Sequence, residues 1–433
     1  RRQRQMCIRD RYWSLRAMKP SEIPQSVRDL AAKCEIRLAP RFAEIDEVSM
    51  KCTERVMEAF QEFKVSDSCF AGTTGYGYDD LGRETLDKVW ARVFGAESAL
   101  VRIGFVNGTH AIASAIFAAL KPGDTLMSTM GAPYDTLRTA IGISGDAFGS
   151  LRFYGVGYHQ VNTLDGAPDM ASIRRAAEGL QPAAALIQRS RGYDARRALT
   201  VDEIGEIVRT IKSVSPDTAC IVDNCYGEFT DVIEPTMVGA DLIAGSLIKN
   251  PGGGLAPTGG YIAGREDLVS NAANRLTVPG IGGECGSTLG NNRALFQGLF
   301  MAPHTTAQAL KTAALCAAML EELGFKTEPG AMEKRSDIIQ TITLETPENL
   351  KRFCKGIQSG SPVDSYVTPE PWAMPGYEDE VIMAAGAFIQ GSSIELSCDG
   401  PMREPYFAFL QGGLTYESGK LGIMNAIAEM LDK

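Results

Sequence analysis

The sequence contains the stretch Asp241-Leu-Ile-Ala-Gly-Ser-Leu-Ile-Lys-Asn-Pro-Gly-Gly-Gly254, in which Lys249 ends an apolar run directly before a turn of proline and glycines. Apolar residues on one side and exposed backbone on the other predict a desolvation that lowers the pKa of the Lys249 ammonium. Such an amine suits the formation of a Schiff base. The alternative is a lysine that packs its stem at a strand end and keeps its ammonium in water. A Walker A phosphate loop is excluded, because its lysine follows the glycines.

A carboxylate precedes this lysine at the end of another apolar run. The segment Ala219-Cys-Ile-Val-Asp223 has the pattern of a buried strand, and Asp223 lies 26 residues before Lys249, enough for one crossover and the next strand. Enzymes that use pyridoxal phosphate need a lysine for the cofactor aldehyde and an aspartate that keeps the pyridine nitrogen protonated. The pair therefore favours pyridoxal 5'-phosphate as the cofactor, with a turn-forming aspartate as the alternative.

A third segment has the features of a phosphate site. Val106-Asn-Gly-Thr-His-Ala-Ile-Ala-Ser114 opens an expected helix after an expected strand, and Gly108 allows a close approach of the backbone. We expect free N–H groups of Thr109, His110 and Ala111 to face an anion at the positive end of this helix. Ser246 adds a hydroxyl in this interpretation. A plain N-cap is the alternative.

Taken together, these segments resemble the methionine gamma-lyase family of fold-type I pyridoxal phosphate enzymes, whose members are also called cystathionine beta-lyase-like or aluminium-resistance proteins. The likeness runs from about residue 20 to the C-terminus. Its motifs are Gly75-Tyr-Gly-Tyr-Asp-Asp-Leu-Gly-Arg83, Asn107-Gly-Thr-His-Ala111, Gln188-Arg-Ser-Arg-Gly-Tyr193 and Ser246-Leu-Ile-Lys-Asn-Pro-Gly-Gly-Gly-Leu-Ala-Pro-Thr-Gly-Gly-Tyr261.

The resemblance implies a role for each part of the cofactor site. It implies a Schiff base at Lys249, a pyridinium partner at Asp223, and phosphate contacts from three residues, which are Gly108, Thr109 and Ser246. It also implies an aromatic ring stacked on the cofactor, for which Tyr134 is the candidate and His110 the competitor. Tyr134 as ordinary core packing is the alternative.

Further residues are expected at the cofactor phosphate and at the substrate carboxylate. In the lyases that this chain resembles, a tyrosine and an arginine reach the phosphate from the neighbouring subunit, and Tyr76 and Arg83 are the nearest matches. This implies a homodimer or homotetramer with shared active sites. For the substrate carboxylate, the planar guanidinium of Arg403 is the first candidate, with Arg191 and Arg189 as alternatives. A solvated surface arginine is the other interpretation of Arg403.

The pattern around these motifs predicts an α/β protein, and the resemblance implies that its fold is of the fold-type I transferase kind. Short apolar runs alternate with helical stretches, which predicts a mainly parallel sheet with ligands at the carboxyl ends of its strands. The expected strands of this sheet are 99–103, 125–127, 183–187, 219–222, 242–244 and 260–263. A helix over 305–323, strands at 381–389 and 393–397, and a closing helix predict a small C-terminal α+β domain. The expected divisions are 1–19, an extension foreign to the fold; 20–65, a helical arm; 66–304, the large domain; and 305–433, the small domain.

Composition sets limits on the function. The 433 residues carry a net charge of −10, which argues against a nucleic-acid partner. No run of apolar residues reaches the roughly 20 that a membrane span needs. Ten scattered cysteines favour a reducing, cytoplasmic compartment, and with only three histidines we expect no metal centre.

The function expected from these observations is that of a lyase that cleaves a carbon–sulfur bond of a small sulfur-containing amino acid by β- or γ-elimination. Methionine, cystathionine and cysteine are the substrates considered. An aminotransferase or an aldolase would use the same lysine and aspartate, and both remain alternatives. A catalytically idle regulator on the same scaffold is the alternative from a different class.

Overall fold

The computed structural model of this chain describes residues 19–432, apart from 146, 193–195 and 374–378. The expected foreign extension, residues 1–19, therefore lies outside the described residues except for Lys19. The chain forms two compact units. The larger unit comprises Asp46–Ala307 and Arg335–Asp337, and the smaller unit comprises the residues up to Ile45, Gln308–Lys334 and Ile338–Lys433. Two long helices, α2 (Gln25–Glu62) and α9 (Asn292–Glu322), contribute residues to both units.

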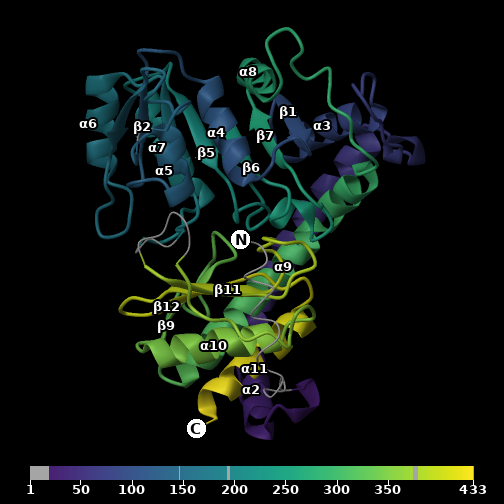
Figure 1. Ribbon diagram of the computed structural model, residues 1–433, viewed down its shortest axis with the longest axis vertical. Helices are drawn as coiled ribbons and strands as arrows, with labels where there is room; N and C mark the ends of the chain where they lie inside the picture. The colour runs from purple at the N-terminus through teal and green to yellow at the C-terminus, as the bar shows by residue number, and fades with distance from the viewer. Residues whose placement is uncertain (1–18, 146, 193–195, 374–378, 433) are drawn as a thin grey trace. The chain divides into compact units, whose positions relative to one another are not determined.

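A seven-stranded sheet forms the centre of the larger unit (Figure 1). Its strand order is β1-β7-β6-β5-β4-β2-β3, and all neighbours are parallel except β7, which runs antiparallel to both β1 and β6. The strands are β1 (Ser98–Arg102), β2 (Thr125–Ser128), β3 (Gly157–Gln160), β4 (Ala184–Gln188), β5 (Ala219–Asp223), β6 (Leu242–Ser246) and β7 (Gly260–Gly264). The predicted mainly parallel sheet is thus confirmed.

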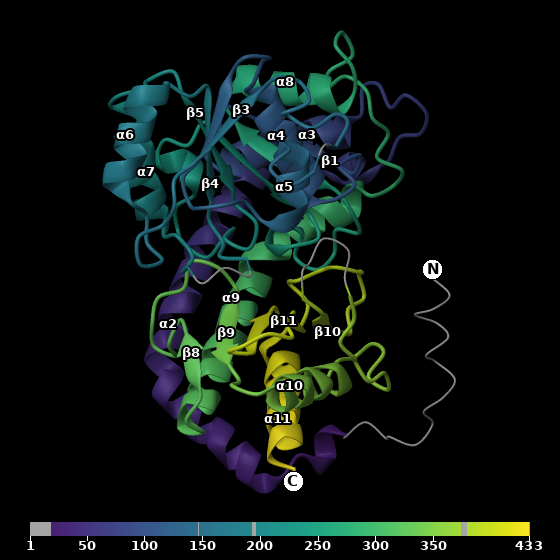
Figure 2. The same ribbon diagram turned by 60° about the vertical axis from the view of Figure 1, so that its left-hand side comes forward.

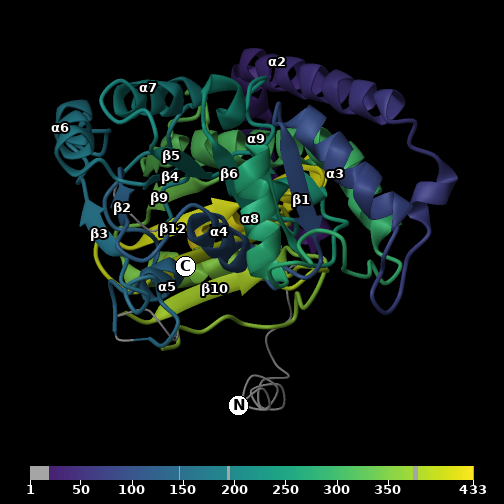
Figure 3. The ribbon, with the colours of Figure 1, turned by 90° about the horizontal axis from the view of Figure 1, so that it is seen from above.

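Helices cover both faces of this sheet (Figure 3). One face carries α3 (Leu81–Val93), α6 (Met170–Leu180) and α7 (Val201–Lys212). The other face carries α4 (Gly108–Ala118), α5 (Asp135–Ile141) and α8 (Glu266–Leu276). Because both faces are covered, the central strands β4, β5, β6 and β7 are buried and consist mostly of apolar residues, as parallel strands generally do.

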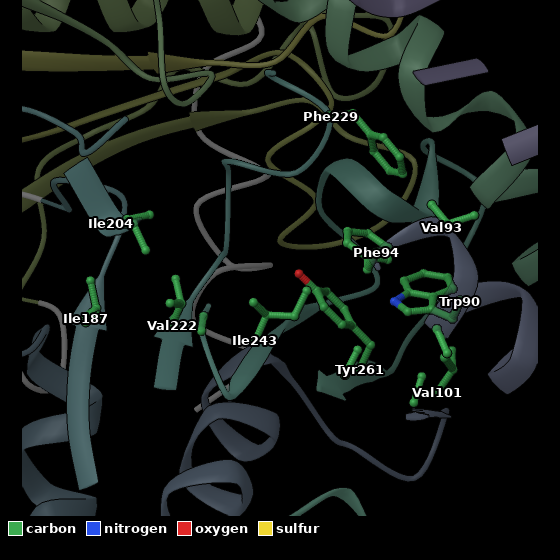
Figure 4. Close-up of a cluster of buried hydrophobic side chains, with 14 of the residues drawn as sticks. Trp90, Val93, Phe94, Val101, Ile187, Ile204, Val222, Phe229, Ile243 and Tyr261 are labelled. Atoms are coloured by element: carbon green, nitrogen blue, oxygen red, sulfur yellow. The ribbon is translucent and has the colours of Figure 1, made fainter. Parts of the chain in front are cut away.

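The alternation of side chains along each strand divides the core into two clusters. In β5, Cys220 and Val222 pack in the cluster with α7, whereas Ile221 packs in the cluster with α4. Near β7, an aromatic group of Trp90, Phe94 and Tyr261 fills the first cluster, with the Trp90 and Tyr261 ring centroids 5.3 Å apart (Figure 4). These large buried rings fix α3 against the sheet.

The smaller unit contains a five-stranded antiparallel sheet in the order β10-β11-β12-β9-β8 (Figure 2). Its strands are β8 (Lys326–Glu328), β9 (Gln340–Thr343), β10 (Val381–Ala385), β11 (Ser397–Pro401) and β12 (Phe407–Gln411). Helices α10 (Pro347–Ser359) and α11 (Tyr416–Leu431) pack together and share a core cluster with this sheet. The predicted α+β character of the C-terminal part is confirmed.

The differences from the sequence-based prediction are local. All six strands expected in the large domain are present, but β3 was missed. The expected strand at 393–397 is wrong, because the strand there, β11, begins only at Ser397. Helix α9 begins at Asn292, thirteen residues before the expected start, and contains Pro303.

Candidate active site

Lys249 lies at the carboxyl end of β6, in a tight turn. Its N–H donates to the Ser246 carbonyl at 3.4 Å, and its own carbonyl accepts from Gly252 at 3.2 Å. Gly252 is required here, since a Cβ at this position would lie 1.7 Å from the Leu247 carbonyl oxygen. The turn therefore holds the Lys249 backbone rigidly at the edge of the sheet where ligands of open α/β folds bind.

Asp223 ends the neighbouring strand β5, whose register pairs it with Ala244 of β6. Its carboxyl group is buried and accepts a hydrogen bond from the Cys225 N–H at 3.1 Å. Burial raises the pKa of Asp223, and the Lys249 ammonium opposes this shift. Asp223 ends β5 and Lys249 follows the neighbouring parallel strand β6, so the structure places the predicted lysine and aspartate at the same edge of the sheet.

The pKa of Lys249 corrects the sequence-based expectation. Burial does lower the pKa of the ammonium, but the acidic neighbours Cys225, Tyr226 and Asp223 raise it, and the net pKa lies above the ordinary value. The prediction of a lowered pKa is therefore wrong for the chain as described here. The reason is that Lys249 is surrounded by acidic side chains as well as by apolar ones.

The start of α4 lies directly against the end of β6. A Cβ at Gly108 would lie 3.1 Å from the Ser246 Cβ and 3.6 Å from the Cys225 Sγ. Both Gly108 and Ser246 were proposed from sequence as phosphate contacts, and the structure places them side by side. The lack of a side chain at Gly108 is what permits this approach.

Only part of the expected set of free N–H groups is available at this helix start. Asn107 is the N-cap, and its Oδ1 accepts the N–H of His110 at 2.9 Å while its carbonyl accepts that of Ala111 at 3.3 Å. The expectation of free groups at His110 and Ala111 is therefore wrong, because the N-cap residue satisfies both. The imidazole Nδ1 of His110 accepts from the Val106 N–H at 3.2 Å, so this ring nitrogen is turned back to the preceding loop.

Tyr134 joins the same site from the start of α5. Its hydroxyl donates to the Thr109 Oγ1 at 3.1 Å, and its N–H donates to the Oε1 of Gln188 at 3.2 Å. Gln188 ends β4 and pairs in register with Asp223. Burial and the nearby Asp223 carboxyl raise the pKa of Tyr134, so the phenol stays protonated and can act as a donor.

Tyr76 lies in the loop before α3, and Arg83 lies in the first turn of α3, where it joins that loop to a second loop of the larger unit. The Arg83 guanidinium is buried and donates to the carbonyls of Gly77, Gly286 and Glu284 at 2.5, 2.8 and 3.1 Å. Tyr76 is 77% exposed, and its ring stacks on that of Tyr78. Arg83 thus braces the loop, whereas the Tyr76 side chain extends into solvent. Contacts of either residue with a cofactor phosphate remain predictions.

The three candidate arginines for the substrate carboxylate have different surroundings. Arg403, in the smaller unit, is exposed and donates to Asp379 at 3.1 Å. Arg191 is buried in the larger unit. Arg189 is also buried, and it donates to Asn224 at 2.8 Å and to Thr230 at 3.0 Å. Arg189 is therefore engaged in a structural network. The role of Arg403 or Arg191 toward substrate stays a prediction.

Two residues beside Lys249 were not identified from the sequence. Cys225 lies against Gly108, and burial raises the pKa of its thiol, so the thiol is neutral. The Tyr226 ring lies under the Lys249 ammonium, with 3.6 Å between Nζ and the ring centroid. Their place in the sequence could have identified them, since both lie within three residues after Asp223, where the chain leaves the carboxyl end of a strand and enters the ligand site.

The chain is similar to known proteins over most of its length. The family profile for methionine gamma-lyase matches residues 27–431. The chain is 46% identical to the uncharacterized protein YnbB of Bacillus subtilis (strain 168) over 411 residues, which are 94% of this chain and 97% of that protein. It is 25% identical to the L-methionine gamma-lyase of Pseudomonas deceptionensis over 259 residues, which are 59% of this chain and 57% of that enzyme.

Solved structures give the same result. The carbon-sulfur lyase involved in aluminum resistance from Clostridium novyi NT is 51% identical, with a TM-score of 0.91 over 94% of this chain and 97% of that one. The pyridoxal-5'-phosphate dependent protein YhfS from Escherichia coli, at 18% identity and a TM-score of 0.60 over 89% and 97% of the two chains, shares the fold. The predicted resemblance and fold class are confirmed, and this chain belongs to the methionine gamma-lyase family.

Proposed function

We propose that this chain is a pyridoxal 5'-phosphate-dependent carbon–sulfur lyase that acts on a small sulfur-containing amino acid by β- or γ-elimination. One observation carries the proposal. Lys249, Asp223, Tyr134 and the start of α4 at Gly108 meet at the carboxyl ends of neighbouring parallel strands. Membership of the methionine gamma-lyase family supports both the cofactor and the type of reaction.

The residues present fit this cofactor. We call Gly108, Thr109 and Ser246 the phosphate cradle. The backbone at Gly108 carries no side chain, and Thr109 and Ser246 have hydroxyl groups beside it, as a phosphate group at a positive helix end requires. The buried Asp223 carboxyl is an acceptor for a pyridinium N–H, and the Lys249 amine is the nucleophile for an aldehyde. Lysine, aspartate and hydroxyl donors together match the groups that pyridoxal phosphate offers.

When bound, pyridoxal phosphate stabilises the electron pair that a substrate Cα–H bond releases. Lys249, in the neutral form of its amine, would be the base that takes this Cα proton, since it follows β6 at the edge of the sheet where Asp223 ends β5. The Tyr134 hydroxyl carries one proton, which it donates to Thr109 in this structure and would redirect to the departing thiolate. We assign the substrate carboxylate to Arg403 or Arg191, and we propose a homodimer or homotetramer whose loop at Tyr76 completes a partner's site.

The function is tested with purified protein, pyridoxal phosphate, and cystathionine, methionine or cysteine offered separately. We expect release of a thiol and a 2-keto acid in equal amounts from at least one substrate. Lys249→Ala should abolish this release, and the exposed Lys64→Ala is the matched control that should not affect it. Transfer of the amino group to an added keto acid without thiol release would instead indicate an aminotransferase.

A further inference from the structure

Tyr226 has an unusual backbone conformation directly beside the proposed catalytic lysine. Its φ is +72°, in the left-handed region that bulky residues seldom adopt. The Asn250 side chain holds this conformation in place, since its Nδ2 donates to the carbonyls of Tyr226 at 2.9 Å and of Glu228 at 3.0 Å. Asn250 follows Lys249 in the chain. Asn250, the residue after Lys249, therefore fixes the backbone of Tyr226.

The consequence of this backbone is that the Tyr226 ring faces the lysine amine. The Lys249 Nζ lies 3.6 Å from the ring centroid, well within the distance at which an ammonium is attracted by the face of an aromatic ring. Tyr134, the tyrosine proposed as donor, is engaged with Thr109 through its hydroxyl. The two tyrosines thus have different positions, one at the phosphate cradle and one beneath the amine.

We propose that Tyr226 is the residue that positions Lys249, by holding its protonated amine on the ring face whenever that amine is not bonded to the cofactor. The proposal rests on the proposed function. In an elimination, the substrate Cα–H bond breaks and an N–H bond forms on the neutral Lys249 amine, which becomes an ammonium. The electron pair stays on the substrate carbon, where a bound pyridoxal phosphate would stabilise it. The ring then keeps the ammonium at the site, so that its proton can be returned to a later carbon centre.

Other charged and titratable groups also surround Lys249, and the proposal must be separated from their effects. Asp223 on β5 and the Cys225 thiol influence the pKa of the lysine, and the lysine in turn influences the pKa values of Glu228 and Tyr134. A change at Tyr226 alone leaves all of these groups in place, but it also removes the Tyr226 hydroxyl, which itself raises the pKa of Lys249. The ring contact is therefore tested by comparing variants that all lack this hydroxyl and differ only in the ring.

The test measures the reactivity of the Lys249 amine in the full-length chain without cofactor. The protein is labelled with 1-fluoro-2,4-dinitrobenzene over a series of pH values, and mass spectrometry compares the Lys249 peptide with that of the exposed Lys64 as internal reference. Loss of the ring contact increases the neutral, reactive fraction of the amine below its pKa. For Tyr226→Leu we expect labelling of Lys249 to be faster by roughly 2- to 30-fold, the range that loss of a cation–π contact predicts.

Two further variants keep the test decisive if Tyr226→Leu does not fold. Tyr226→Phe retains the ring but removes the hydroxyl, which also raises the pKa of Lys249, so it should label at a rate between those of wild type and Tyr226→Leu. Pentafluorophenylalanine at position 226 retains the shape of the ring but removes its negative face, so it should label as fast as the leucine variant. Equal labelling of Lys249 in Tyr226→Phe, Tyr226→Leu and the pentafluoro variant would overturn the proposal, whether or not wild type differs from them. Since labelling requires no turnover, this result is independent of whether thiol release is found.

Discussion

Gly252→Ala should displace the catalytic turn, and the structure gives the size of the displacement. The added Cβ would lie 1.7 Å from the Leu247 carbonyl oxygen and 2.7 Å from the Ala256 Cβ. Carbon and carbonyl oxygen atoms normally approach to about 3.3 Å, so the two segments must separate by about 1.5 Å. Leu247 and Gly252 flank Lys249, and the Gly252 N–H donates to the Lys249 carbonyl. The separation therefore moves the lysine itself.

A misplacement of about 1 Å in an active site costs roughly 100-fold in rate, so we expect thiol release by Gly252→Ala to fall by at least this factor. Overpacking should also reduce the free energy of unfolding by about 1–3 kcal/mol, measured by denaturant titration. The control is Gly179→Ala in α6, where nothing lies within 4 Å of the added Cβ. That change should leave activity intact. Thiol release by Gly252→Ala within threefold of wild type would refute the argument.

Three further changes test individual parts of the larger unit. Burial raises the pKa of Glu228 to about 8 from the ordinary 4.5, so the folded chain retains a proton that the unfolded chain loses between these pH values. The free energy of unfolding should thus fall as pH rises across that window, and Glu228→Gln should flatten this slope in chemical denaturation; an unchanged slope would contradict the assignment. Gly108→Ala adds a Cβ 3.1 Å from the Ser246 Cβ, and should weaken pyridoxal phosphate binding about 10-fold or more in a fluorescence titration. Binding with wild-type affinity would show that the cofactor phosphate does not lie at Gly108. Arg189→Ala removes donors to Asn224 and Thr230 and the ion pair with Glu234 at 3.8 Å. It should destabilise the fold by about 3–5 kcal/mol in thermal and chemical unfolding, and a stable variant with a raised KM alone would instead identify Arg189 as a substrate ligand.

Most strands of the large sheet could be predicted from the sequence, because they are buried on both faces and therefore consist of consecutive apolar residues. Strand β3 could not, since Gly157-Tyr-His-Gln160 lies at the sheet edge with three of its four residues exposed and carries little apolar pattern. The start of α9 was missed for a different reason. Pro303 lies inside the helix, and a proline is ordinarily taken as a helix boundary.

The arrangement of the site could be predicted where it follows from strand order. Asp223 and Lys249 end or follow neighbouring parallel strands, so their meeting depends only on the topology of the sheet. The conformation after β5 does not follow from such a pattern. The position of Tyr226 depends on a left-handed residue and on the Asn250 side chain, both of which are set by tertiary contacts. The hydrogen bonds of Asn107 as N-cap also follow from local geometry, and they engage N–H groups that the sequence predicts to be free.

The proposed function depends most directly on the covalent attachment of the cofactor to one lysine. Purified protein is incubated with pyridoxal phosphate, reduced with borohydride, digested, and mapped by mass spectrometry for a pyridoxyl group. We predict that the group is found on Lys249 and that Lys249→Ala loses it together with the visible absorption band of the bound cofactor. A pyridoxyl group on a different lysine, or none on any peptide of a folded protein, would contradict the account.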